Sequence, residues 1–166
     1  RAGDVMSYTF SQIKNHSNVA LEDFYWRDML PDEVRLGKIV TGTWSERLTY
    51  SVEYRTNRKN SWRTLEDGLS SKVSYTLDCG RENLKLAADE YVTEFRFNFG
   101  TVQPGFCEET GPTIFVTTLA NLKNGYRIVN RTDAGGRTGE EWVIGKDSWI
   151  TVVWNKDRGD LPKTGI

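Results

Sequence analysis

Residues that could carry acid–base or nucleophilic chemistry are few in this sequence, and their spacing does not group them. Its one histidine, His16, lies in a polar, turn-like segment, and no serine or cysteine motif accompanies it. The acidic doublets Glu108-Glu109 and Glu140-Glu141 could supply the paired carboxylates of a glycosidase, but neighbouring residues of a strand point to opposite faces. The sequence therefore predicts no catalytic residue, no enzyme and no cofactor.

The chain has two cysteines, Cys79 and Cys107, both in polar, turn-like surroundings. In a secreted protein they could form a disulfide, which at this loop length would stabilise the fold by about 3–4 kcal/mol. Two cysteines alone do not distinguish a bridge from two free thiols, so both states stay open. A metal site is not expected, because one histidine and no cysteine pair at ligand spacing are too few ligands.

The last residues, Leu161-Pro162-Lys163-Thr164-Gly165, have the composition of an exposed, extended tail. Pro162 fixes its own backbone and favours an extended Leu161, and Gly165 allows a tight bend. The stretch resembles the LPxTG sorting signal of Gram-positive surface proteins, with Leu161, Pro162, Thr164 and Gly165 in the fixed positions. The resemblance implies that a sortase recognises these residues, cuts between Thr164 and Gly165, and joins the Thr164 carbonyl to the cell wall.

The charge of the chain and the sorting resemblance each bear on its partners, and the resemblance also bears on its location. The 22 basic and 23 acidic residues give a net charge of −1 without a basic stripe, so nucleic acid is not an expected partner. The sorting resemblance implies sortase and peptidoglycan as partners, and covalent anchoring in the cell wall at the extracellular surface. It also implies a membrane-spanning apolar run beyond Ile166.

Strand patterns dominate the rest of the chain. Aromatic residues make up 12% of its 166 residues, and aromatic side chains favour strands. Phe95, Phe97 and Phe99 alternate with polar residues, as in a core strand. Asn83–Glu90 is the expected helix, of one or two turns. The expected strands are 5–13, 19–26, 48–55, 62–65, 73–77, 91–99, 114–119, 126–130, 140–144 and 149–154.

Many short strands separated by Gly, Pro and Asn predict a β-sandwich. We expect an all-β fold, an immunoglobulin-like antiparallel β-sandwich with about nine or ten strands and at most one short helix. It should occupy residues 1–156, followed by an extended sorting tail at 157–166.

Roughly the first 31 residues carry a second resemblance. Its positions are Gly3-Asp4-Val5, Tyr8-Thr9-Phe10, Asn18-Val19-Ala20-Leu21 and Asp28-Met29-Leu30-Pro31. They resemble the opening of a family of repeated bacterial surface domains named only as a domain of unknown function. Members are immunoglobulin-like sandwiches that build the stalks of wall-anchored proteins. The sequence departs from the family at Asn15-His16-Ser17, and the resemblance is looser at Phe99–Phe106 and Tyr126–Asn130.

This resemblance implies a wall-proximal stalk module of an adhesion-related, sortase-anchored surface protein. Related sandwiches also join a core Lys to a core Asn in an isopeptide bond, assisted by a buried carboxylate. Asp28 and Asn130 fall at the acid and Asn positions. The relatives place the Lys at or before the first strand, whereas this chain has none before Lys14. Asp28 and Asn130 are therefore expected to be structural core residues, with the isopeptide role as the alternative.

Tryptophans suggest another function. Trp44, Trp62, Trp142, Trp149 and Trp154 could include an exposed platform for stacking sugars, although sandwich tryptophans are usually core residues. Trp142 and Trp149 are expected to pack as a hairpin pair around Gly145-Lys146-Asp147. The alternative function is thus an adhesin module that binds a glycan or host protein directly. A cell-wall hydrolase is the third reading.

Overall fold

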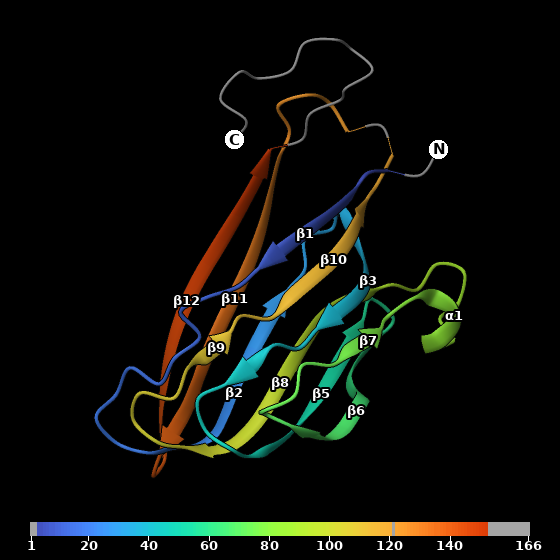
Figure 1. The fold of residues 1–166 in the computed structure, drawn as a ribbon. Helices are drawn as coiled ribbons and strands as arrows, with labels where there is room; N and C mark the ends of the chain where they lie inside the picture. The colour runs from blue at the N-terminus through green and yellow to red at the C-terminus, as the bar shows by residue number, and fades with distance from the viewer. Residues whose placement is uncertain (1–2, 121, 153–166) are drawn as a thin grey trace.

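Buried and outward-facing side chains alternate along the strands of this protein. In the computed structural model, Phe95, Phe97 and Phe99 are buried, while Arg96 and Asn98 between them are half-buried on the other side of the sheet. The structure describes residues 3–120 and 122–152. There, twelve strands make two facing antiparallel sheets and a two-stranded ribbon, with one short helix (Figure 1). The predicted all-β, antiparallel sandwich is confirmed.

The larger sheet has six strands in the order β12-β11-β2-β8-β5-β6, the smaller has four in the order β1-β10-β3-β7, and β4 pairs with β9. The strands are β1 (Val5–Thr9), β2 (Leu21–Met29), β3 (Val34–Val40), β4 (Thr43–Trp44), β5 (Thr49–Thr56), β6 (Lys59–Ser70), β7 (Thr76–Asp78), β8 (Val92–Val102), β9 (Glu108–Thr110), β10 (Thr113–Thr118), β11 (Arg127–Thr138) and β12 (Glu141–Val152). Helix α1 spans Arg81–Leu84.

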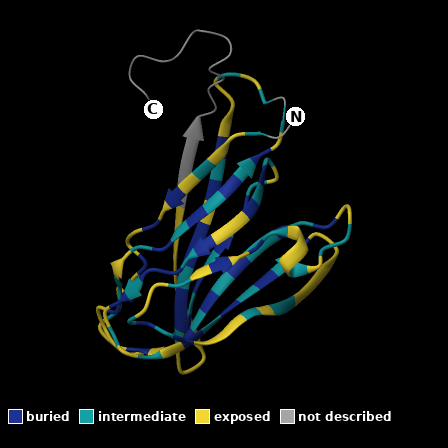
Figure 2. Ribbon diagram, turned by 45° about the vertical axis from the view of Figure 1, so that its right-hand side comes forward, coloured by how far each residue is buried: buried dark blue, intermediate teal, exposed yellow. Residues whose placement is uncertain are grey.

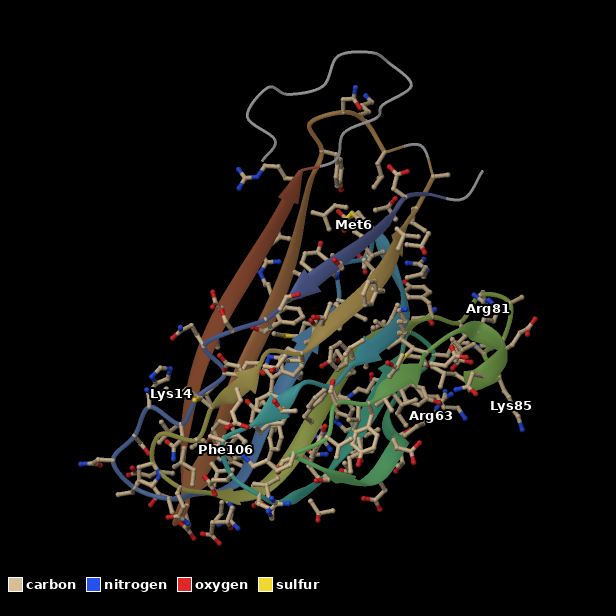
Figure 3. The ribbon with its side chains drawn as sticks, in the orientation of Figure 1. Met6, Lys14, Arg63, Arg81, Lys85 and Phe106 are labelled. Carbon is tan, nitrogen blue, oxygen red and sulfur yellow. The ribbon has the colours of Figure 1, made fainter. Side chains whose placement is uncertain are left out.

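Aromatic rings fill the space between the two large sheets. The Trp44 ring stacks on Phe106 with 5.7 Å between centroids, and Trp26 meets Phe97 edge-on at 5.0 Å. Phe106 points inward from its loop in Figure 3. Exposed residues gather instead on the turns and on the outer strand β6 (Figure 2). Because each buried ring removes a large apolar area from water, this cluster supplies much of the driving force for folding.

The two described ends of the chain lie at the same end of the molecule (Figure 1). Val5 pairs with β10 near the end of that strand, and Val152 pairs with the first residue of β11. Glu33 ties down the connection between β10 and β11. Its backbone oxygen accepts from the Leu119 amide at 2.8 Å, and its carboxylate accepts from the Tyr126 hydroxyl. The chain thus enters and leaves on one side, and the opposite end carries turns between strands.

The expected strand number and helix bounds are wrong. The described residues form twelve strands and not nine or ten, because β3 and the short β4 and β9 are not predicted, whereas the expected strands 140–144 and 149–154 are the single strand β12. The helix begins at Arg81 and ends at Leu84, since Lys85 adopts a left-handed conformation with a φ of 54°. Glu90, expected to close the helix, instead accepts hydrogen bonds from the Thr56 hydroxyl and the Ala87 amide.

The expected hairpin between Trp142 and Trp149 is also wrong. Both residues belong to the single strand β12, so they cannot face each other across a turn. Gly145 continues the strand, and the turn lies earlier, where Gly139 has a φ of +61°. Glycine in the first of two turn residues is the preference of a tight hairpin, which explains why the chain reverses there.

Candidate functional site

The outward side of the six-stranded sheet carries polar and aromatic side chains. Alternation sends Phe24 and Trp26 of β2 into the core and leaves Tyr25 and Arg27 half-buried on the other face. These outward residues and their neighbours form a cavity of about 480 Å³, which we call the outer-face groove. Its lining is Asp23, Phe24, Tyr25, Arg27, Arg55, Trp62, Arg96, Asn98, Gly100 and Trp142.

Trp142 forms one wall of the groove. It lies on the edge strand β12, and 52% of its surface is exposed. Its ring centroid is 6.3 Å from that of Tyr25, at an angle of 60°. The contact leaves about half of an aromatic side chain open to solvent beside the cavity.

Trp62, on β6, forms the wall on the other side. The guanidinium groups of Arg55 and Arg96 lie over its ring, 4.2 and 4.1 Å from the centroid. Such cation–π contacts hold the ring in place across the sheet and contribute about 0.5–1 kcal/mol each at exposed sites. Trp62 is half-buried, so part of its surface still lines the groove.

Ion pairs fix the polar floor between the two tryptophans. The Arg27 guanidinium donates two hydrogen bonds to Asp133, at 3.0 and 2.6 Å, and one to Glu94 at 3.2 Å. On the next strand, Arg96 and Asn98 both donate to Glu53, at 2.8 and 2.5 Å. The Arg27–Asp133 pair is bidentate, and a pair of this kind fixes the orientation of both partners.

Two groups of the floor keep their protonation state at neutral pH. The hydrogen bond to Asp133 raises the pKa of Arg27, which stays charged. Burial, followed by the charge of Asp133, raises the pKa of Tyr25, which stays a neutral phenol that can donate a hydrogen bond. These two side chains are therefore suited to binding and not to proton transfer.

A bulge between β2 and β8 contributes Asp23, Phe24 and Gly100 to the lining of the groove. The β2–β8 register shifts around Phe24, opposite Gly100, whose φ is +76°. Next to it, Asp23 has a φ of 51°, a conformation that costs a residue with a side chain about 1–2 kcal/mol. The bulge carries the Asp23 carboxylate to the groove, where Arg137 donates to it at 2.6 Å. Strain of this kind is concentrated at functional sites.

Asp28 and Asn130, predicted from the family resemblance, lie together in the core. Both are fully buried, and the Asn130 side-chain amide donates to the Asp28 carboxyl at 2.8 Å. Burial raises the pKa of Asp28 to about 8, which the hydrogen bond from Asn130 only partly offsets. Lysines in the described ranges are exposed or half-buried; Lys14 projects away from the core, and Met6 occupies the first strand (Figure 3). An isopeptide bond therefore lacks its amine among these residues.

The possible disulfide does not form. Cys79 is a buried free thiol whose Sγ donates to the Leu77 carbonyl oxygen at 3.6 Å, and burial raises its pKa to about 12. Cys107 is a half-buried free thiol in another part of the fold, where its amide donates to the Ser45 hydroxyl. Cys79 directly follows β7, and Cys107 directly precedes β9.

Other predicted positions have separate outcomes. Leu161, Pro162, Thr164, Gly165 and Trp154 lie outside the described residues, as does the side chain of Trp149, so the sortase role remains a prediction. Trp44 is a buried core residue. In the described ranges, His, Cys, Asp and Glu make no group of three that could hold a metal ion. The helix found there is too short to cross a membrane.

Sequence reasoning identified Trp62 and Trp142 as possible sugar-stacking residues but missed the floor between them. Tyr25, Arg27 and Asn98 come from strands that are distant in sequence, and only the strand order brings them together. A polar residue at every second position of β2 and β8 was the available signal. No model of a known protein family matches this chain, and comparison with curated proteins finds no significant match.

Proposed function

We propose that this chain is the wall-anchored module of a Gram-positive surface protein, and that its sandwich presents a ligand-binding face. The observation that carries the proposal is the outer-face groove, in which Trp62 and Trp142 flank a floor of fixed polar side chains. Anchoring follows from the sorting motif, through which a sortase would join Thr164 to peptidoglycan.

The placement of the chain ends supports display of this face. Trp142 is the second residue of β12, next to the hairpin turn, whereas the described chain leaves at Val152. Ten residues of strand correspond to about 33 Å, so the groove lies well away from the side through which the chain enters and leaves. A module connected at one end leaves its other end and its outer face open to a partner.

A stalk module is the second candidate, and the antiparallel sandwich architecture favours it. In that role, the hydrogen bonds between strands would carry load between the wall and the upstream part of the protein. The two functions are compatible only if the domain resists force applied at its ends, which are on the same side of the molecule.

The anchoring part is tested by sortase-catalysed ligation. The chain is incubated with a Gram-positive sortase and fluorescent triglycine, and the products are weighed by mass spectrometry. We expect the Thr164–Gly165 bond to break, an amide to form between Thr164 and triglycine, and Gly165-Ile166 to leave. Pro162→Ala should abolish this product. If the unmodified chain gives no product while a free LPxTG peptide does, the anchoring proposal is wrong and the groove is unaffected.

A further inference from the structure

We infer that the outer-face groove binds an uncharged oligosaccharide. This inference rests on the proposed function in that it names the ligand of the displayed face. It does not depend on the sorting tail, because every residue that carries it belongs to the described sandwich.

The walls of the groove suit the apolar faces of sugar rings. A pyranose exposes C–H groups on its faces and hydroxyl groups around its rim, so it pairs with an aromatic face beside hydrogen-bonding groups. Trp142 offers an aromatic side chain that is 52% exposed, and Trp62, whose ring lies under the guanidiniums of Arg55 and Arg96, lines the cavity on the other side. The volume of about 480 Å³ falls within the range of small-ligand sites.

The floor suits the hydroxyl groups. Asn98, Arg27 and Arg96 each use only part of their hydrogen-bonding capacity on the carboxylates that orient them, since an amide has four bonding positions and a guanidinium has five donors. The Tyr25 phenol adds a further donor. A ligand with several neighbouring hydroxyls can use these groups without displacing the ion pairs.

The charge balance of the groove argues against an acidic ligand. Four arginines meet five carboxylates around it: Arg27, Arg55, Arg96 and Arg137 with Glu22, Asp23, Glu53, Glu94 and Asp133. Each of these guanidiniums already has a carboxylate within 4 Å. An anionic sugar, a phosphate or a nucleic acid would have to compete with those partners, whereas a neutral sugar would not.

The position of the groove argues against an extended peptide. Peptides commonly bind by adding a strand to a sheet edge, where backbone groups are unpaired. The floor belongs to β2 and β8, which are paired on both sides within the sheet. Only side chains are available there for recognition, and those of Arg27, Arg96 and Asn98 are polar.

The inference is tested on an array of immobilised oligosaccharides. One arm holds uncharged chains of host type, one holds uncharged chains of bacterial wall type, and one holds sialylated, uronate and sulfated chains. We expect binding confined to the uncharged arms, and the arm that binds identifies the source. The tightest ligand is then titrated calorimetrically against the full chain and its variants.

Trp142→Ala and Trp62→Ala should each weaken binding by about tenfold or more, and Trp142→Phe should restore most of it. Val143→Ala is the matched control, because Val143 is an exposed neighbour on the same strand that does not line the groove. Thermal unfolding checks that each variant is folded. If Trp62→Ala does not fold, Asp23→Asn provides the second groove variant.

The inference would be overturned by no binding to any uncharged chain, by binding confined to the acidic arm, or by binding that is unchanged in both tryptophan variants. Selective capture of a protein by the same groove, with no glycan bound, would also overturn it. That last result would leave the proposed display function standing, whereas failure of the sortase ligation would remove the anchoring and leave the groove.

Discussion

The ring of Trp142 on β12 lies 6.3 Å from the ring of Tyr25 on β2, although β11 runs between those two strands. Gly135 is the β11 residue that pairs with Tyr25, and it has no side chain to separate the two rings. A Cβ atom at this position would lie 2.4 Å from the backbone oxygen of Val143. Gly135 therefore permits the close approach of β12 that makes Trp142 a wall of the groove.

Substitution of Gly135 should damage both stability and binding. Gly135→Ala must push β12 away, and we expect it to lower the free energy of unfolding by about 1–3 kcal/mol and to weaken glycan binding. Urea denaturation and calorimetry measure the two effects. Gly145→Ala is the control, because nothing lies within 4 Å of its Cβ position, and it should change little. Equal effects of the two substitutions would contradict this account of Gly135.

Asp23 should contribute to ligand binding at a cost to the stability of the fold. Asp23→Gly removes the left-handed strain of a residue whose φ is 51° and loses only an exposed ion pair with Arg137. We expect the free energy of unfolding to rise or to stay within about 1 kcal/mol, while glycan binding weakens. Lys85→Gly relieves similar strain away from the groove, at a φ of 54°, and should leave binding unchanged. Weaker binding in both variants would point to a global effect.

The Asp28–Asn130 pair should make stability depend on pH. In the folded protein, the pKa of Asp28 is about 8, whereas in the unfolded chain it is about 3.9. Between these values the folded state holds a proton that the unfolded state has lost, so stability falls as pH rises. The slope from this one group is at most about 1.4 kcal/mol per pH unit.

Asp28→Asn should remove that contribution. The new amide can still accept from Asn130 and donate to its oxygen, but it does not titrate. Urea denaturation from pH 4 to pH 8 should show the variant gaining stability relative to the unmodified protein as pH rises. Asp32→Asn, at an exposed position, is the control and should track the unmodified protein. A stability difference between Asp28→Asn and the parent that is constant across this range would contradict a raised pKa.

The stalk function can be tested by measuring the force at which the domain unfolds. The described chain ends lie on one side, so pulling them apart applies force across β1 and β12 and breaks their hydrogen bonds in succession. Pulling instead between the N-terminal end and a handle at Gly139, at the opposite end, loads the strands along their length. Single-molecule pulling should give a distinctly lower unfolding force in the first geometry. Equal forces would favour a load-bearing stalk.

Residue alternation predicted much of the fold. Phe95, Phe97 and Phe99 line the core as their spacing indicates, and the all-β sandwich follows from many such strands. Local patterns could not locate the turn of the last hairpin, because Gly139 and Gly145 look alike in sequence. Only pairing with β11 decides that Gly139 turns and Gly145 continues the strand.

The candidate site was less accessible to sequence reasoning. The sequence does not distinguish an exposed tryptophan from a core tryptophan. Only the assembled sheets show that Trp44 is buried and Trp142 is exposed. The strain at Asp23 arises from a bulge between β2 and β8, which no local motif announces. The sorting motif, in contrast, can be found from the sequence alone, because it is a short linear motif that does not depend on the fold.

The most direct test of the binding face is an NMR titration of the tryptophan indole N–H signals. The signals are assigned from single Trp→Phe variants, and the ligand is the uncharged oligosaccharide that binds most tightly on the array. The account predicts shifts for Trp62 and Trp142, which line the groove, and none for the core residues Trp26 and Trp44. Saturating ligand that shifts neither Trp62 nor Trp142 would contradict the account.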